Sequence, residues 1–584
     1  MHLISEMEII NFKSCKNLKI KLEGFSPLVG YNNAGKTNIL KAIDALVKGK
    51  AIGEDGFNDI TQPLIIRAEL TGLNDEVLSH LSAPQRSSLQ PYIENDCIHI
   101  QFKQDGLGKT ALTLGVRAPS DQYGEWVNPN GIPQAISTLF PEPTFINSME
   151  DAAEDVSKFK AGNTIGKLIS NLQKEILKTK LEELSTALSA VGKKLNLNGS
   201  ERLQELSDFD GAINAKIGDF FPGIELHVDI PTPEISDLFK QGTIKVSERG
   251  NSNTRDFSSM GHGAQRAIQM TLIRHLSEIT KDITKEGKTN LLLIDEPELF
   301  LHPQAIEQIR SSLKILAKKG YQVIFSTHSP FMIEPEDIPI TNIVRKHDEG
   351  TKVEARLTDA IETVLGDHDA QARLLFDTYN LGQILFSDMV LIAEGDTEKH
   401  VLPSLFKAIS GKSLGESRLA LVIATGAGNI PGMLNILKEM KIPAKALADL
   451  DFAFTAAKKQ NLIAVDNEDI NACLDIIAKM QPTHGFELQG RLPKNSSSHR
   501  ASDIYELLAG ESDALNHLCT IRDELKTKSI WIWSAGAIEP HLCLEAKTTG
   551  EWFKFKQKLA VDRVEDVVHD LVYITDFVNW CQEP

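Results

Sequence analysis

The chain has 584 residues, 41% of them hydrophobic and 24% charged, which is the balance of a globular protein. This composition excludes a disordered, collagenous or fibrous chain, and no apolar run of about 18 or more residues predicts a membrane span. The net charge of −18 repels nucleic acid at long range, so binding of nucleic acid must come from local basic patches or bound divalent metal.

The amino-terminal segment and the cysteines both indicate a cytoplasmic protein. The first residues, MHLISEMEIINFKS, carry acidic side chains early and lack the basic segment and apolar core of a secretory signal. The six cysteines are scattered and form no Cys-x-x-Cys pair, so neither a zinc site nor a disulfide framework is expected. We therefore expect a reducing, cytoplasmic environment and no membrane partner.

A glycine-rich loop follows the first short β-type runs. Residues 30–37 read GYNNAGKT, which matches G-x-x-x-x-G-K-[ST] and lies between a predicted strand and a predicted helix. Backbone N–H groups of such a loop wrap a phosphate chain, Lys36 adds a positive charge, and the Thr37 hydroxyl can ligate Mg²⁺. The candidate ATP-binding residues of this loop are Gly30, Asn33, Gly35, Lys36, Thr37 and Asn38.

The character of the chain changes between about residues 150 and 220. This stretch is rich in Leu, Lys and Glu, with apolar residues at helical spacing. Two interpretations stay open: a helical arm or pairing surface, and solvated helices packed on their own domain.

Two later apolar runs end in polar residues, as buried parallel strands with chemistry at their carboxyl ends do. In LLLIDE (291–296), the strand can deliver Asp295 to the Mg²⁺ of a nucleotide, and Glu296 can polarise the attacking water. In IFSTHS, His328 stands at a strand end and can contact the γ-phosphate.

The segment SSMGHGAQR (258–266) places small residues just before a predicted helix. Its backbone amides and Ser259 could approach a γ-phosphate that the loop at 30–37 already holds. That approach must come from another surface, most simply a second copy of the chain. The sequence therefore predicts a dimer closed by ATP.

These elements, in this order, resemble the ABC-type ATPase head of the RecF/SMC-like class, and NFKS and DEPELFLHP sharpen the match. The resemblance implies that Lys36, Thr37, Asp295 and Glu296 act in cis. It implies that Ser259, Gly261, Gly263 and Gln265 act in trans, although their spacing is G-x-G-x-Q rather than the usual LSGGQ.

A second α/β pattern begins near residue 385 with acidic residues at the ends of apolar runs. VLIAEGDTE gives Glu394 and Glu398, which can face one site if a helix starts after the glycine. KALADLDF gives Asp449 and Asp451, which share a face if they lie on a strand. Glu539 follows another short apolar stretch. Acids gathered in this way are costly unless a cation neutralises them.

Strand-Glu-Gly-helix followed by strand-Asp-x-Asp resembles a Toprim fold. Such oxygen clusters hold Mg²⁺ or Mn²⁺, and two ions about 4 Å apart can stabilise both oxygens of a phosphodiester under attack. The expected metal ligands of the whole chain are Thr37, Asp295, Glu394, Glu398, Asp449, Asp451 and Glu539. The expected catalytic residues are Glu296, His328, Glu394, Asp449 and Asp451.

An ABC head followed by Toprim, with the EGDTE spelling, resembles the OLD (overcoming lysogenization defect) family over about 1–345 and 385–545. The resemblance implies metal-dependent cleavage of DNA under the control of ATP, a helical dimerisation insert, and a role in anti-phage defence. Family members act alone or with partners, among them the Gabija helicase and the reverse transcriptase with the RNA–DNA hybrid of some retrons.

Many relatives place a lysine shortly before the glutamate that corresponds to Glu539. Ser534 and Ala535 stand there in this chain, and Lys526, Lys528 and Lys547 are the candidates to replace it. Trp531 and Trp533 alternate on a predicted strand and are expected in the core, and the last residues are expected to form packed helices.

The predicted protein is therefore an α/β chain with an ABC-type ATPase head, a helical insert and a Toprim domain. The predicted ranges are an amino-terminal ATPase lobe at 1–150, the dimerisation insert at 151–220, the second ATPase part at 221–345, a linker at 346–384, the Toprim domain at 385–545 and carboxyl-terminal helices at 546–584. The predicted function is an ATP-regulated, divalent-metal-dependent endonuclease of DNA that forms a homodimer or a higher homo-oligomer. Two alternatives stay open: a DNA-repair ATPase whose Toprim unit binds without cutting, and an effector held inactive in a larger complex containing RNA or DNA.

Overall fold

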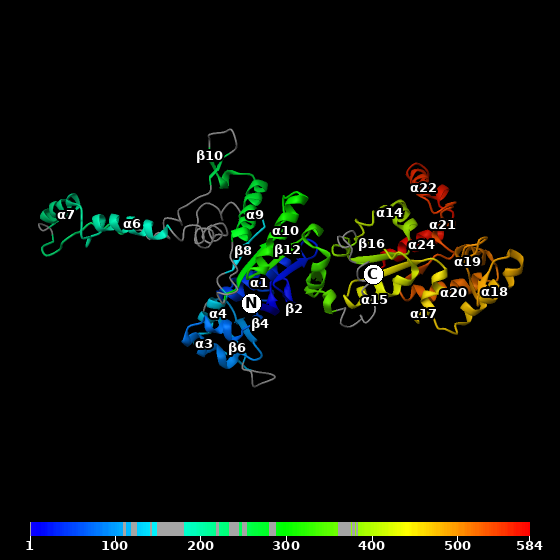
Figure 1. Ribbon diagram of the computed structural model, residues 1–584, viewed down its shortest axis with the longest axis horizontal. Coiled ribbons are helices and arrows are strands. Elements are labelled where there is room, and N and C mark those ends of the chain that lie inside the picture. The colour runs from blue at the N-terminus through cyan, green and yellow to red at the C-terminus, as the bar shows by residue number, and fades with distance from the viewer. Residues whose placement is uncertain are drawn as a thin grey trace. The chain divides into compact units, whose positions relative to one another are not determined.

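The computed structural model describes residues 2–108, 112–117, 125–140, 143–148, 180–217, 221–232, 245–247, 254–279, 288–359, 375, 380 and 383–583. Contacts divide the chain into two compact units (Figure 1). The first comprises Met1–Leu28, Gly35–Thr327 and Asp348–Thr351, and the second comprises Val29–Ala34, His328–His347 and Lys352–Pro584. No helix of the described ranges is long and apolar enough to cross a membrane.

An antiparallel sheet opens the first unit, with strand order β2-β1-β4-β5-β6-β7. The strands are β1 (Leu3–Phe12), β2 (Cys15–Lys21), β4 (Leu64–Thr71), β5 (Ile98–Gln104), β6 (Leu112–Arg117) and β7 (Trp126–Val127). In β4, every second side chain is buried, because alternate residues of a strand point to opposite faces and one face packs on the core.

A second sheet of the first unit carries the nucleotide motifs. In it β3 (Phe25–Val29), β12 (Tyr321–Thr327), β11 (Asn290–Asp295) and β8 (Thr144–Ile146) are neighbours in that order. β11 pairs in parallel with both β12 and β8, and Asp295 stands opposite Ser326. Every residue of β12 is buried, as expected for a parallel strand covered on both faces.

The helices of this unit are α1 (Lys36–Lys48), α2 (Asp75–Ser79), α3 (Ala83–Leu89), α4 (Ile132–Leu139), α9 (His262–Ile279) and α10 (Pro303–Lys318). α10 packs against α9 and against β12. A two-stranded ribbon, β9 (Lys245–Ser247) with β10 (Thr254–Asp256), precedes α9. β13 (Asn342–His347) and β14 (Gly350–Val353) follow β12 along the chain and neighbour each other.

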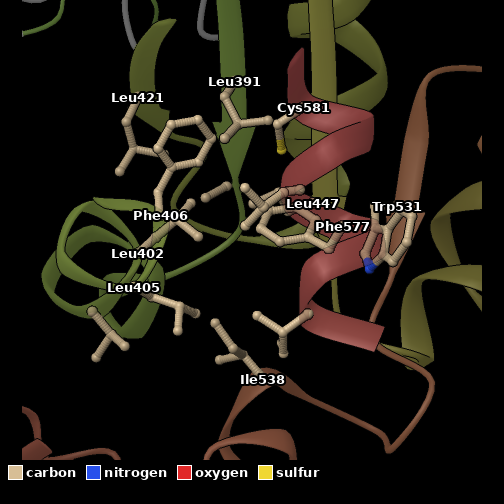
Figure 2. Close-up of a cluster of buried hydrophobic side chains, with 14 of the residues drawn as sticks. Leu391, Leu402, Leu405, Phe406, Leu421, Leu447, Trp531, Ile538, Phe577 and Cys581 are labelled. Carbon is tan, nitrogen blue, oxygen red and sulfur yellow. The ribbon is translucent and has the colours of Figure 1, made fainter. Parts of the chain in front are cut away.

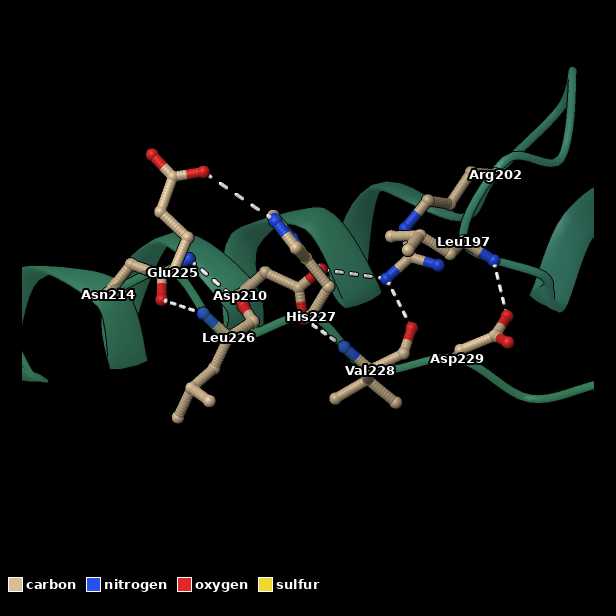
Figure 3. Close-up of polar contacts among 9 residues, drawn as sticks. All are labelled: Leu197, Arg202, Asp210, Asn214, Glu225, Leu226, His227, Val228 and Asp229. Atoms are coloured by element: carbon tan, nitrogen blue, oxygen red, sulfur yellow. Dashed lines mark hydrogen bonds and ion pairs between the residues drawn. The ribbon is translucent and has the colours of Figure 1, made fainter. Parts of the chain in front are cut away.

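The described part of the predicted insert contains two helices, α6 (Leu181–Leu195) and α7 (Gln204–Ile217). A polar network ties the chain that follows to α7 (Figure 3). The buried carboxylate of Asp210 accepts hydrogen bonds from the Arg202 guanidinium at 2.8 Å and from the Val228 N–H at 2.9 Å. The start of the insert, 151–179, and much of the predicted linker lie outside the described residues.

The second unit is built on a four-stranded parallel sheet with order β16-β15-β17-β20. Its strands are β15 (Met389–Ala393), β16 (Leu419–Ile423), β17 (Ala444–Ala448) and β20 (Ile530–Ile532). The helices between them are α14 (Asp396–Ser410), α15 (Ile430–Glu439), α16 (Asp451–Phe454), α17 (Ala456–Lys459), α18 (Glu468–His484), α19 (Ala501–Gly510) and α20 (Leu515–Lys526), and a short ribbon pairs β18 (Leu488–Gln489) with β19 (Leu492–Pro493).

The chain ends in α21 (Ile538–His541), α22 (Thr549–Val561), α23 (Val564–Val567) and α24 (Leu571–Gln582). α14 packs against both α22 and α24. The core between them and the sheet contains Phe406, Leu447 and Phe577 together with fully buried Trp531 (Figure 2). Trp533 is also fully buried and belongs to the same cluster. The prediction that both tryptophans are core residues and that the last residues pack as helices is therefore confirmed.

Candidate nucleotide site and candidate metal centre

The loop between β3 and α1 depends on two of its glycines. Gly35 has a φ of 104°, and a Cβ there would lie 2.1 Å from Oγ1 of Thr351. A Cβ on Gly30 would lie 2.1 Å from the carbonyl oxygen of Val344. Any side chain at these two positions would therefore displace neighbouring atoms, which explains why this local sequence needs glycine.

Thr37 and Asp295 meet although they lie 258 residues apart. The Thr37 hydroxyl donates to both carboxylate oxygens of Asp295, at 2.9 and 3.0 Å. The hydroxyls of Ser148 (3.1 Å) and Ser326 also donate to this carboxylate. Asp295 is the last residue of β11, as predicted. The hydroxyl and the carboxylate that were expected to share Mg²⁺ are thus held side by side.

Lys36 is 4% exposed and begins α1. Burial lowers the pKa of its ammonium to about 8, while the nearby carboxylates of Glu296, Asp295 and Glu298 act in the opposite direction. An ammonium at the start of a helix, where backbone N–H groups have no partner within the helix, is a setting in which polyphosphates bind.

Arg266 was missed as a site residue by the sequence analysis. It is 5% exposed, and its guanidinium donates to the carbonyl oxygens of Asp295 and Glu296, both at 2.6 Å, and of Asn147 at 3.1 Å. It therefore links α9 to the end of β11. The sequence contains one indication of this role, because Arg266 is a charged residue within SSMGHGAQR that the nucleotide motifs do not use.

The residues just before α9 and its first turn present small residues outward. A Cβ on Gly261 would meet no atom within 4 Å, and one on Gly263 would meet Cβ of Phe300 at 3.7 Å. Ser259 is exposed, with its hydroxyl donating to the Asp256 carbonyl at 2.6 Å. The side chain of Gln265, by contrast, is buried.

The amide of Gln265 is buried and donates to the carbonyls of Phe257 (3.2 Å) and Met260 (3.0 Å) of its own chain. This side chain holds the loop in shape.

Two asparagines of the glycine-rich loop have structural contacts of their own. Asn33 has a φ of 65°, and the Asn38 amide donates to the Ser14 hydroxyl at 2.8 Å. His328 directly follows β12.

The acids of the second unit stand at the carboxyl edge of its sheet. Glu394 follows β15, Glu398 lies in the first turn of α14, and Asp449 follows β17. Asp451 begins α16, and Glu539 lies in α21 after β20. Because parallel strands end at one edge, these five residues gather there.

The expectation that Asp449 and Asp451 share the face of a strand is wrong. β17 ends at Ala448, so Asp449 lies in the turn and Asp451 is the first residue of a helix. The physical reason is that a parallel strand reaches the edge of the sheet and the chain must reverse there. The helix that was expected after Gly395 is confirmed.

Hydrogen bonds from neighbouring groups orient the carboxylates. The Asp449 N–H donates to Oε2 of Glu394 at 3.1 Å, and the Thr397 hydroxyl donates to Oε1 of Glu539 at 2.6 Å. The sequence analysis missed Thr397, although it stands inside the EGDTE motif. One oxygen of Asp451, Oδ1, is buried without a hydrogen-bond partner among the described residues.

Burial, together with the charge of neighbouring acids, raises the proton affinity of the gathered carboxylates. Burial, with the Asp451 charge, raises the pKa of Glu394 to about 7. Burial, with the Glu539 charge, raises the pKa of Glu398 to about 7. Burial also raises the pKa of Asp449 well above its ordinary value. Carboxylate oxygens gathered in this way fit a hard divalent cation, which would reduce the repulsion among them.

Of the three candidate lysines, Lys547 lies at the acids. Its ammonium is 3.4 Å from Oδ2 of Asp449 and 3.4 Å from Oε2 of Glu539. Lys526 pairs with Asp576, and Lys528 pairs with Glu524. No group of three or more His, Cys, Asp or Glu side chains in the described ranges has the arrangement of a metal site.

The two units define a class of protein: a nucleotide-binding ATPase head joined to a Toprim unit. The family profile of the AAA ATPase domain matches residues 3–82 and 101–333. The profile of the overcoming lysogenization defect protein-like TOPRIM domain matches residues 385–451.

The Old nuclease of Escherichia phage P2 is 35% identical to this chain over 592 positions, 99% of each chain. The chain therefore belongs to the OLD family of nucleases with an ATPase domain. Endonuclease GajA of Bacillus cereus strain HuB5-5 is 20% identical and covers 92% of this chain and 83% of its own. Among solved structures, an SMC head bound to the C-terminal winged-helix domain of ScpA is 15% identical, with 61% and 99% of the two chains covered and a TM-score of 0.36.

Proposed function

We propose that this chain is an ATP-regulated endonuclease that hydrolyses DNA phosphodiesters with Mg²⁺ or Mn²⁺. The observation that carries the proposal is the gathering of five acids at one sheet edge, two of them with a pKa raised to about 7. The proposed metal ligands are Glu394, Glu398, Asp449, Asp451 and Glu539. The names of the nuclease relatives support cleavage over binding alone.

A bound divalent ion would supply a reactive hydroxide at neutral pH and charge stabilisation at the phosphate. The residues of the chain have distinct tasks around it. The backbone N–H of Asp449 donates to Glu394, so the chain at the end of β17 orients the Glu394 carboxylate. Lys547 carries a positive charge to the same place, where it can stabilise the charge that develops on the phosphate oxygens. We propose that Lys547 replaces the lysine that many relatives carry shortly before the glutamate corresponding to Glu539.

The ATPase unit is proposed to bind and hydrolyse ATP and thereby control cutting. Lys36 and the loop backbone would hold the phosphates, Thr37 and Asp295 would hold Mg²⁺, and Glu296 with His328 would act at the γ-phosphate. The contribution of a second copy is proposed to come from Ser259 and Gly261, which precede α9, and from Gly263 in its first turn. Gln265 would shape this part of the chain, since its amide bonds its own chain.

The helical insert is proposed to pair with the insert of a second copy. Its described part and the residues just after it, 180–217 and 221–232, expose large hydrophobic side chains, which a protein surface seldom leaves uncovered in one region. These are Leu184, Val191, Leu197, Leu203, Phe209, Phe221, Ile224, Leu226 and Ile230. Replacing Phe209 and Phe221 with Ser should halve the mass measured by light scattering. The control, Phe553→Ser, removes an exposed aromatic of the other unit and should leave the mass unchanged.

Incubation of supercoiled plasmid with purified protein and Mn²⁺ tests the cleavage. The wild-type chain should nick it, and Glu394→Gln should reduce nicking to background. Asp475→Asn, which alters an exposed acid paired with Arg491 in the same unit, is the matched control and should keep full activity. Nicking that persists in Glu394→Gln would contradict the assignment, and no nicking by wild type would favour the binding-only alternative. Comparison with and without ATP shows whether the nucleotide activates or restrains cutting.

We further propose a role in anti-phage defence, alone or with a helicase or a reverse transcriptase and its RNA–DNA. Cells that express the wild-type chain should survive phage infection better than cells that express Glu394→Gln. Equal survival of the two strains would contradict this role.

A further inference from the structure

The segment 533–539 connects the parts of the proposed metal centre. At one end, Nε1 of Trp533 donates to Glu398 at 3.0 Å, and at the other end the segment carries Glu539. Between them, the Gly536 carbonyl accepts a hydrogen bond of 2.8 Å from the Leu450 N–H, which lies between the two acids of the Asp-x-Asp motif. A shift of this short segment would therefore move several carboxylates at once.

Two side chains hold the middle of the segment by consecutive backbone groups. The Ser534 N–H donates to the Tyr573 hydroxyl at 3.1 Å, and the Ala535 N–H donates to Nε2 of His541 at 3.2 Å. The Tyr573 hydroxyl also donates to the carbonyl of Ile532, the last residue of β20. Tyr573 thus bridges the end of the strand and the start of the segment.

The two supporting rings form one unit. They stack with centroids 4.4 Å apart and planes at 2°, and His541 is 3% exposed and Tyr573 8%. Because Nε2 of His541 accepts a hydrogen bond, the ring proton belongs on Nδ1, which lies 3.4 Å from Oδ2 of Asp570. Asp570 in turn caps α24 by accepting from the Tyr573 N–H at 3.2 Å. The supports therefore come from α24, which carries Tyr573, and from α21, which carries His541, and Asp570 just before α24 holds both.

We infer that Tyr573 and His541 are positioning residues that fix segment 533–539 so that its carboxylate neighbours can bind divalent metal. The inference rests on the proposed function. It assigns a task to the last helix of the chain, which the sequence analysis treated as packing alone. Outer groups that orient metal ligands commonly contribute about 10- to 100-fold to metal affinity or activity.

Titration of the full-length chain with Mn²⁺ in the absence of nucleotide, with free Mn²⁺ read by electron paramagnetic resonance, tests the inference. Tyr573→Phe keeps the ring and removes the hydroxyl, so it should weaken Mn²⁺ binding at least about 10-fold. Raising Mn²⁺ should recover most of the nicking rate. The control, Ile574→Val, removes a methyl group from the fully buried neighbour in the same helix and should leave Mn²⁺ affinity unchanged.

Two histidine variants separate positioning from packing. His541→Gln keeps a hydrogen-bond acceptor and should retain more Mn²⁺ affinity than His541→Leu, which has none. If Glu394→Gln abolishes Mn²⁺ binding but Tyr573→Phe and His541→Leu both keep wild-type Mn²⁺ affinity, the inference is overturned. If wild type bound no Mn²⁺, or Glu394→Gln bound it normally, the proposed function would fail, and the inference would fail with it.

Discussion

The indole Nε1 of Trp533 donates a hydrogen bond of 3.0 Å to Oε1 of Glu398, across 135 positions of the chain. Both side chains are buried, so the bond orients a carboxylate that the protein removes from water. It joins the first and the last acidic motifs of the Toprim unit. The hydrophobic core around Trp533 is therefore connected by a hydrogen bond to the proposed metal centre.

Trp533→Phe should lower Mn²⁺ affinity by about 10-fold, because Glu398 loses the donor that orients it. The measurement is the same nucleotide-free Mn²⁺ titration. Trp531→Phe is the matched control, since Trp531 is equally buried and its Nε1 has no hydrogen-bond partner among the described residues. It should cost stability without changing Mn²⁺ affinity. A parallel loss in both variants would mean that packing, not the bond to Glu398, is what matters.

Without metal, the protein should lose stability as the pH rises from about 4.5 to 7. The pKa of Glu394 and of Glu398 is raised from 4.5 to about 7 in the folded chain, so between these values the folded state binds more protons than the unfolded state. The free energy of unfolding therefore falls with pH across this window and is level above it. Melting temperatures measured from pH 5 to pH 8 should show this decline.

Mn²⁺ should raise the melting temperature more at pH 8 than at pH 5.5, since protons compete with metal for the same oxygens. The double variant Glu394→Gln, Glu398→Gln should flatten the metal-free decline. An unchanged pH slope in that variant would show that other groups cause the effect.

Lys547→Met should reduce the nicking rate by about 100-fold at saturating Mn²⁺, because a positive charge near the scissile phosphate is lost. Lys526→Met removes a comparable side chain that pairs with Asp576 instead, and it should keep its activity. If Lys547→Met bound Mn²⁺ more tightly and cut at the normal rate, the ammonium would be only a counter-ion for the acids.

Arg266→Gln should leave ATP binding nearly intact and lower the rate of hydrolysis by about 100-fold, since Asp295 and Glu296 lose the donor that fixes their backbone. Equilibrium binding of a fluorescent ATP analogue and phosphate release separate the two effects. Arg274→Gln changes an exposed arginine of the same helix, α9, and serves as the control. Equal hydrolysis by Arg266→Gln and wild type would show that the contact has no catalytic consequence.

Much of this protein was predictable because its motifs are continuous in sequence. GYNNAGKT and EGDTE each follow a strand and run into a helix, and LLLIDE is a strand with acids at its end, so local sequence carries both the backbone shape and the chemistry. The order of these motifs was enough to predict the two α/β units and the OLD family. The acids Glu394 and Glu398 were placed correctly relative to their helix for the same reason.

The remaining features needed the tertiary structure. The sequence offered three lysines near one another, and only the packing of the last helices distinguishes Lys547, since charge alone makes them equivalent. Arg266 donates to backbone carbonyl oxygens, which every residue has, so no pattern of side chains in the sequence could predict its partners. Tyr573 and Trp533 look like core aromatics in any sequence pattern. Their polar atoms meet the site because the fold brings distant segments together, and a hydrogen bond between distant segments leaves no periodic trace in the chain.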